Sequence, residues 1–103
     1  MNKVRAAQQF FDGVEVILTV ENTYRPGLNG TRRQITRVGK SFYDAKLLDA
    51  SSDGTQPAGR SCRGVIPTRA GEVISVTDSE ATFRLGAPGT WIGEHHVTYR
   101  KVT

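Results

Sequence analysis

The chain has 103 residues, of which 37% are hydrophobic, and a formal net charge of +4 at pH 7. This length fits one domain with a modest core, and the dispersed hydrophobic residues exclude a wholly disordered protein. A single cysteine, Cys62, excludes an intramolecular disulfide, and no apolar run is long enough to span a bilayer or to act as a secretory signal. We therefore expect one soluble domain over residues 1–103, located in the cytoplasm.

Residues 2–11 fit a short helix, because Val4, Ala7 and Phe11 share one helical face. Phe10 and Phe11 are neighbours in the sequence, so a helix packed on one face should expose one of them unless a partner or a second subunit covers it. The prediction therefore allows either a monomer or a homodimer.

Three strands are predicted before residue 49. Residues 14–20 show period two, which is typical of a strand with one buried face. One face carries Val14, Val16, Leu18 and Val20, and the other carries Glu15, Ile17 and Thr19. Residues 31–38 form the second predicted strand. A bulge is expected in it, because Ile35 and Val38 would point to opposite faces of a regular strand. Residues 41–48 form the third, and the three together indicate a meander.

The second half of the chain also indicates short strands. Residues 49–60 are rich in polar residues, Gly and Pro and predict an exposed loop inside the domain, followed by a brief strand at 65–66. Segments 72–76 and 81–85 are separated by a hairpin-length turn, and residues 97–102 alternate again. The predicted fold class is mainly β, a small antiparallel barrel or sandwich with a short N-terminal helix.

The first half of the chain resembles the opening strands and loop of SH3-like barrels of the KOW and Tudor type. The residues that carry the resemblance are Gly13-Val14-x-Val16, Pro26-Gly27-Leu28-Asn29-Gly30-Thr31, Ile35-x-x-Val38-Gly39 and Phe42-x-x-Ala45. Gly13 and Gly30 match the family's glycines before the first strand and after the long loop, where the chain reverses sharply. The resemblance implies a small SH3-like barrel over residues 14–102, while the insertion at 49–60 and the N-terminal helix depart from the family.

Such barrels bind nucleic acid, peptides, modified side chains or other protein surfaces, so the fold that the resemblance implies leaves the ligand class open. An arginine-rich chain of this length without an enzymatic motif also resembles small accessory proteins of phages that infect high-GC bacteria.

The basic residues gather in two segments that contain no acid. Residues 22–43 and 54–71 carry eight of the 14 basic residues and none of the ten acidic residues. Such segregation indicates a basic surface for an anionic partner, most commonly nucleic acid. The candidate contact residues are Tyr24, Arg25, Arg32, Arg33, Arg37 and Lys40 in the first segment and Arg60 and Arg63 in the second. The leading hypothesis is nucleic-acid binding of low sequence specificity, in which the arginines contact phosphates and Tyr24 stacks on a base.

Two other interpretations stay open. The same arginines fit ordinary solvent-facing strand positions, where Glu15 or Asp44 neutralises part of their charge. They also fit a protein-interaction module, such as a phage accessory factor that binds an acidic host protein and uses Trp91 or Phe11 as a hydrophobic anchor. For Trp91 a plug at one end of a small barrel is the preferred interpretation.

The sequence predicts neither an enzyme nor a cofactor. Glu94-His95-His96 offers metal-ligand types, but adjacent histidines in an extended segment point to opposite faces and no further ligands lie nearby. Cys62 lacks a catalytic motif. Its neighbours Arg60 and Arg63 predict a thiol of unusual reactivity.

Overall fold

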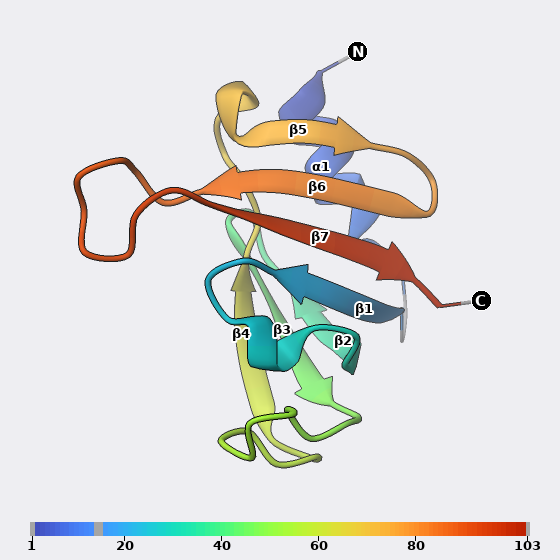
Figure 1. Cartoon of the computed structure of the whole chain (residues 1–103). Helices are drawn as coiled ribbons and strands as arrows, with labels where there is room; N and C mark the ends of the chain where they lie inside the picture. Colours follow the sequence, from blue (N-terminus) through green and yellow to red (C-terminus); the bar gives the residue numbers. More distant parts are fainter. Residues whose placement is uncertain (1, 14–15, 103) are drawn as a thin grey trace.

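Seven strands form one antiparallel sheet in the computed structural model, which describes residues 2–13 and 16–102 (Figure 1). The elements are α1 (Lys3–Phe10), β1 (Ile17–Asn22), the 3-10 turn η1 (Pro26–Leu28), β2 (Arg32–Val38), β3 (Phe42–Leu47), β4 (Ser61–Val65), the 3-10 turn η2 (Ala70–Glu72), β5 (Val73–Val76), β6 (Glu80–Leu85) and β7 (His95–Lys101). The predicted mainly β class with a short N-terminal helix is thus confirmed.

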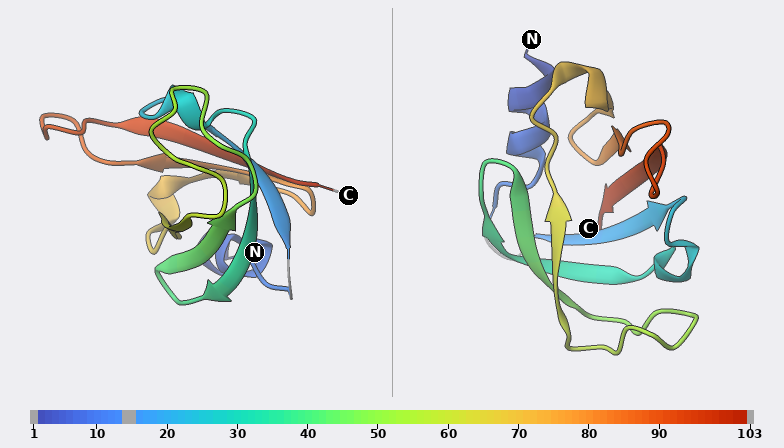
Figure 2. Two further views of the ribbon diagram at one scale, coloured as in Figure 1. Left: turned by 90° about the horizontal axis from the view of Figure 1, so that it is seen from below. Right: turned by 90° about the vertical axis from the view of Figure 1, so that its left-hand side faces the viewer.

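The strands lie in the order β4-β3-β2-β1-β7-β6-β5, so the pairing of β1 with β7 joins two meanders. Figures 1 and 2 show that the sheet is strongly curled, and that β4 runs across the direction of β5, β6 and β7. In the described chain β4 and β5 do not pair with each other, so the sheet stays open rather than closing into a barrel.

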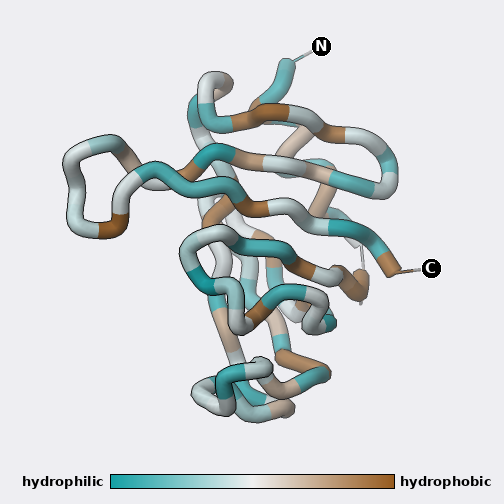
Figure 3. The backbone as a smooth tube through the Cα atoms, viewed as in Figure 1, coloured by the Kyte–Doolittle hydropathy of each residue, from teal (hydrophilic) through white to brown (hydrophobic). Residues whose placement is uncertain are grey.

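Alternation of side chains gives the sheet an inner face, which we define as the face that carries the buried residues. On β1 these are Leu18 and Val20, and on β7 they are Val97 and Tyr99. Figure 3 shows that hydrophobic positions along the strands of the sheet are interrupted by hydrophilic ones. A strand alternates its side chains between two faces, so this pattern places one hydrophobic core inside the curl.

The helix covers part of the inner face. Oδ1 of Asn2 caps it by accepting hydrogen bonds from the backbone N–H groups of Val4 and Arg5 at 3.0 and 3.2 Å. Ala7 and Phe10 are buried, and the helix packs beside β5. A short helix is marginal by itself, so this packing accounts for most of its stability.

An aromatic cluster joins the helix to both halves of the sheet. Phe11 stacks on Tyr43 with ring centroids 4.9 Å apart, and it meets the edge of Tyr99 at 5.3 Å. Phe10 and Phe11 are both buried, so the prediction that one of them is exposed is wrong. Phe11 is the C-cap residue of the helix, and its ring meets that of Phe10 edge to face with centroids 5.3 Å apart, so both rings enter the same core.

The strand predictions hold best where hydrophobic alternation is regular. The third predicted strand corresponds to β3, and the predicted hairpin corresponds to β5 and β6. The predicted bulge is confirmed as a register shift between Ile35 and Arg37. Part of the first predicted strand, Val14 and Glu15, lies outside the described residues.

Two strand predictions need correction. The brief strand expected at 65–66 is instead β4, which begins at Ser61 and pairs along most of β3. Its polar sequence hides it, because β4 is an edge strand whose pairing comes from backbone hydrogen bonds rather than from hydrophobic side chains. The last strand begins two residues earlier than expected, at His95.

Replacing Gly64 by alanine should destabilise the protein. Gly64 pairs with Tyr43, and a methyl group at this position would overlap the Tyr43 ring. We expect a loss of about 1–3 kcal/mol in the free energy of unfolding, measured by urea denaturation, because overpacking displaces neighbouring atoms. Gly71→Ala is the matched control, since its added methyl group meets no atom within 4 Å. Equal stability of the two variants would contradict this account of the Tyr43 contact.

Candidate functional site

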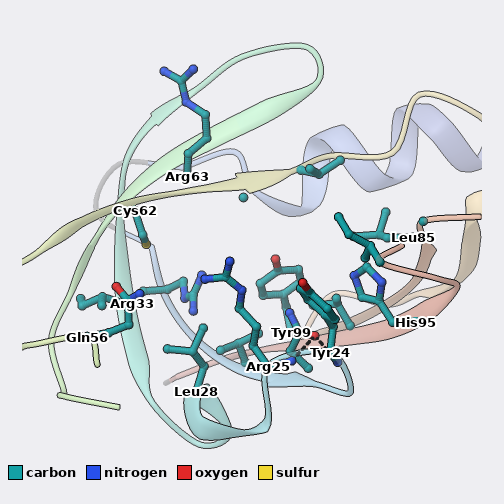
Figure 4. Close-up of a pocket in the computed structure, with 18 of the residues that line it drawn as sticks. Tyr24, Arg25, Leu28, Arg33, Gln56, Cys62, Arg63, Leu85, His95 and Tyr99 are labelled. Carbon is teal, nitrogen blue, oxygen red and sulfur yellow. Dashed lines mark hydrogen bonds between the residues drawn. The ribbon is translucent and has the colours of Figure 1, made fainter. Parts of the chain in front are cut away.

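A pocket of about 450 Å³ opens on the inner face of the sheet (Figure 4). Its walls come from every strand except β5, from the β1–β2, β3–β4 and β6–β7 loops, and from η2. Arg25 and Arg33 from the first acid-free segment line it. Arg63 from the second segment also contributes to the wall, but Figure 4 shows its side chain directed away from the pocket. The fold therefore brings the charges of Arg25 and Arg33 to the pocket, but not that of Arg63.

Two asparagine side chains hold the β1–β2 loop in shape beside this pocket. Oδ1 of Asn22 accepts hydrogen bonds from the backbone N–H groups of Tyr24 and Arg25 at 2.8 and 3.2 Å (Figure 4). Oδ1 of Asn29 accepts one from the backbone N–H of Asn22 at 2.8 Å. Gly30 then takes the left-handed conformation with φ of 77°, as expected for an Asn-Gly turn. Local hydrogen bonds thus set the direction of Tyr24 and Arg25.

An aromatic surface lies at the mouth of the pocket. The ring centroids of Tyr24 and His95 are 5.4 Å apart and their planes are tilted by 37°. The guanidinium carbon of Arg25 lies 5.8 Å from the Tyr24 ring centroid. A flat ring flanked by a cation suits a planar ligand group that stacks.

Arg33 is buried at the floor of the pocket, with 5% of its surface exposed. Arg33 and Ile35 are two positions apart on β2, so both point to the inner face. The interpretation that Arg33 faces solvent is therefore wrong. Its Nη1 donates a hydrogen bond to the hydroxyl of Tyr43 at 3.0 Å. Its Nε is enclosed and has no hydrogen-bond partner, and no carboxylate among the described residues pairs with it.

The groups around Arg33 do not neutralise its charge. The hydroxyl of Tyr43 donates to that of Tyr99 at 2.9 Å. Burial raises the pKa of Tyr43 and raises that of Tyr99 well above its ordinary value, so both phenols are neutral near pH 7. Arginine keeps its proton under the same conditions. The floor of the pocket therefore carries a positive charge without a counterion from the described chain.

Arg32 points away from this pocket and forms an ion pair that the sequence did not predict. Its Nε and Nη2 donate to the two carboxylate oxygens of Asp49 at 3.0 and 2.9 Å. This bidentate pair connects the start of β2 to the loop after β3, and it uses much of the charge that was expected to contact phosphate. The predicted partner Glu15 lies outside the described residues.

A second ion pair lies on β3 and β4. Arg63 Nε donates to Asp44 at 2.8 Å, and its guanidinium carbon is 4.2 Å from the Phe42 ring centroid. Arg37 contacts the same ring at 5.3 Å. Asp44 was expected to neutralise cations of the first segment, but the carboxylate pairs most closely with the second segment.

The remaining predicted cations, Lys40 and Arg60, are exposed and do not line the pocket. Lys40 lies in the β2–β3 turn, and Arg60 immediately precedes β4. In the described part of the chain neither forms an ion pair, so both add positive charge to the surface.

Trp91 lies in the loop between β6 and β7, which projects from the sheet in Figure 1. It is 88% exposed, so the interpretation as a barrel plug is wrong. The loop is internally ordered, because the hydroxyl of Thr90 donates to the carbonyl of Ala87 at 2.7 Å and accepts from the N–H of Gly93 at 3.1 Å. Its next residue, Ile92, reaches the pocket wall.

The histidines behave as predicted for an extended segment. His95 lines the pocket, whereas His96 is exposed on the other face of β7. The described residues contain no cluster of three or more potential metal-ligating side chains.

In that same part of the chain, no helix is long and apolar enough to cross a membrane.

The sequence does not identify His95 and Tyr99 as residues of a binding pocket, because neither belongs to a charge cluster or to a catalytic motif. His95 offers only a metal-ligand type, and Tyr99 lies in the alternating segment at 97–102. One signal was available: Arg33 and Ile35 are separated by two positions, so a strand that buries Ile35 also turns Arg33 inward.

Comparison of the chain with protein-family models, curated protein sequences and solved structures finds no match.

We predict that acid removes the stabilisation from Asp49. Hydrogen bonds from the side chain and backbone of Arg32 lower the pKa of Asp49 to about 2. Because the pKa is lower in the folded state than the usual unfolded value of about 3.9, this stabilisation is present above pH 4 and disappears as pH falls toward 2. Thermal unfolding should show Asp49→Asn to be less stable than the wild type at pH 5, with the difference shrinking by pH 2.

Asp78→Asn is the control for this experiment, since Asp78 is exposed and its side chain forms no hydrogen bond or ion pair in the described chain. A difference between the wild type and Asp49→Asn that stays constant from pH 5 to pH 2 would contradict the assignment.

The Cys62 thiol should react slowly. Burial raises its pKa, and the nearby Arg33 opposes this only in part, so we expect a less reactive thiol than the sequence predicts. We expect alkylation by iodoacetamide at pH 8 to be several-fold slower than for N-acetylcysteine, because the thiolate is the reacting form. The rate is measured by mass spectrometry of native protein, with urea-unfolded protein as the control. A native rate equal to or above that of the free thiol would contradict the prediction.

Proposed function

We propose that this protein is a non-enzymatic binding protein that takes single-stranded nucleic acid with low sequence specificity. The observation that carries the proposal is the meeting of aromatic rings and unpaired arginines in one pocket. Tyr24 and His95 supply a stacking surface for a base, while Arg25 and Arg33 supply charge for the backbone.

The size and shape of the pocket favour a single strand. A half-enclosed space of about 450 Å³ admits an unstacked base with its sugar and phosphate, whereas a duplex keeps its bases stacked and paired. In the described chain α1 is the one α-helix, and its buried Ala7 and Phe10 hold it against the sheet. This arrangement offers no helix for reading a major groove.

Binding accounts for the pocket better than catalysis does. A nucleophile needs a base within hydrogen-bonding reach. His95 instead has its Nδ1 3.4 Å from the carbonyl oxygen of Gly93, and no hydrogen bond joins it to Cys62 or Glu72 in the described chain. The pocket lining therefore supplies stacking and charge.

Exposed Trp91 favours a second candidate, a protein-interaction module such as a phage accessory factor. An exposed tryptophan on an ordered, projecting loop fits the anchor of a protein interface. The Tyr24–His95 surface makes us rank nucleic acid first, because a planar base stacks on it and an aliphatic carboxylate of an acidic protein does not.

We further propose an SH3-like class for the fold. The strong curl and the β1–β2–β3–β4 meander support this class, while the unpaired edges and the N-terminal helix depart from a closed barrel.

Fluorescence anisotropy of labelled single-stranded and double-stranded DNA and RNA across a salt series tests the proposal. We expect single strands to bind more tightly and affinity to fall as salt rises. Tyr24→Ala should weaken binding about 5- to 150-fold through lost stacking, and Arg25→Ala should reduce the salt slope by about 1.

Two controls make the result specific. Tyr24→Phe keeps the ring and should bind nearly as the wild type does. Arg69→Ala removes an exposed arginine outside the pocket and should change little. Absence of binding at low salt, or equal losses in Tyr24→Ala and Arg69→Ala, would reject the proposal.

A further inference from the structure

We infer that the floor of the pocket is a subsite for a terminal phosphate, so that the protein recognises the end of a nucleic-acid strand. The inference deepens the proposed function and rests on it for the identity of the ligand. Two observations support it: the guanidinium of Arg33 is buried, and hydrogen-bond donors at this place lack partners in the described chain.

Arg33 has donors that the described chain does not use. Nη1 donates to Tyr43, while Nε is enclosed without a partner. Nη2 makes no hydrogen bond with the described residues. It is not enclosed as Nε is, so Nη2 is the donor that reaches the pocket. A charged side chain this deeply buried is normally paired, which points to an anion from outside the chain.

Tyr99 adds a neutral donor at the same place. Its hydroxyl accepts from Tyr43, which leaves its own proton free for a ligand oxygen. Tyr99 and Arg33 both line the pocket and are both buried. Together they form a preorganised pair of donors whose direction is fixed by the Arg33–Tyr43–Tyr99 hydrogen bonds.

Arg25 is the second cation of the pocket, and its charge determines which anion fits best. Figure 4 shows Arg25 and Arg33 extending toward the same space from different walls. Neither forms an ion pair with a carboxylate of the described chain. Two unpaired guanidinium groups match the two charges of a phosphate monoester better than the single charge of a carboxylate or of a phosphodiester.

The position of the subsite favours a strand end. Arg33 is 5% exposed, whereas Tyr24 at the mouth is 37% exposed, so a ligand must insert its anionic group first. An internal phosphate carries a nucleoside on both sides and cannot enter in this way, but a terminal phosphate can. The attached base then lies near the Tyr24–His95 surface.

The inference is tested with a short single-stranded oligonucleotide in three forms: 5′-phosphorylated, 3′-phosphorylated and with hydroxyl groups at both ends. Anisotropy should show about 10-fold tighter binding for one phosphorylated form than for the hydroxyl form. This preference should disappear in Arg33→Met and shrink in Tyr99→Phe, while Arg69→Ala keeps it. Thermal unfolding of each variant verifies folding, and if Arg33→Met does not fold, Tyr99→Phe and Arg25→Ala decide.

Calorimetry with adenosine 5′-monophosphate, adenosine and inorganic phosphate separates this inference from the proposed function. Equal affinity for all three oligonucleotides, or a phosphate preference that survives Arg33→Met, overturns the subsite even if nucleic acid binds. Arg33-dependent binding of the monophosphate without any oligonucleotide binding supports the subsite and rejects the strand as its ligand. Absence of binding to every probe overturns both.

Discussion

Tyr43 is the residue on which both the core and the pocket depend. Its ring lies between Phe11 and the backbone of Gly64, so it joins the N-terminal segment to the edge strand β4. Its hydroxyl accepts from Arg33 and donates to Tyr99, so it also connects β2 to β7. One buried side chain therefore belongs both to the hydrophobic core and to the polar floor of the pocket. The contacts that stabilise the curl of the sheet also direct the two donors at the pocket floor.

Burial of Arg33 opposes folding unless something offsets the loss of hydration. A guanidinium inside a protein retains its charge, and one phenol oxygen compensates only part of the lost water contacts. The open side of the pocket relieves this cost, because water or a ligand anion reaches the group there. A core that needed only stability would place a hydrophobic residue at this position, so the arginine is better explained by ligand binding.

The sequence predicts the regular part of this structure and misses what depends on contacts between distant segments. Alternation identifies β3 and the β5–β6 hairpin, because their hydrophobic residues face one core. It does not identify β4, an edge strand held by backbone pairing, or the burial of both Phe10 and Phe11. The charges of the two predicted basic segments do not converge in the pocket, because Arg63 points away from it and pairs with Asp44. The pairing of Arg32 with Asp49 likewise requires a loop conformation that composition alone does not specify.

The fold places the predicted basic residues in different environments, and the environment limits what each can contribute. Arg32 and Arg63 are paired with carboxylates, so a ligand gains little charge from them. Lys40 and Arg60 are exposed and attract any polyanion in a salt-dependent way, without distinguishing one part of it from another. A cation discriminates among ligand groups only where water is excluded and geometry is fixed, because there an ill-fitting group leaves charges unpaired. Arg33 meets both conditions, and Arg25 adds a second charge from the pocket wall, so the selectivity of the protein should lie in the pocket rather than on its basic surface.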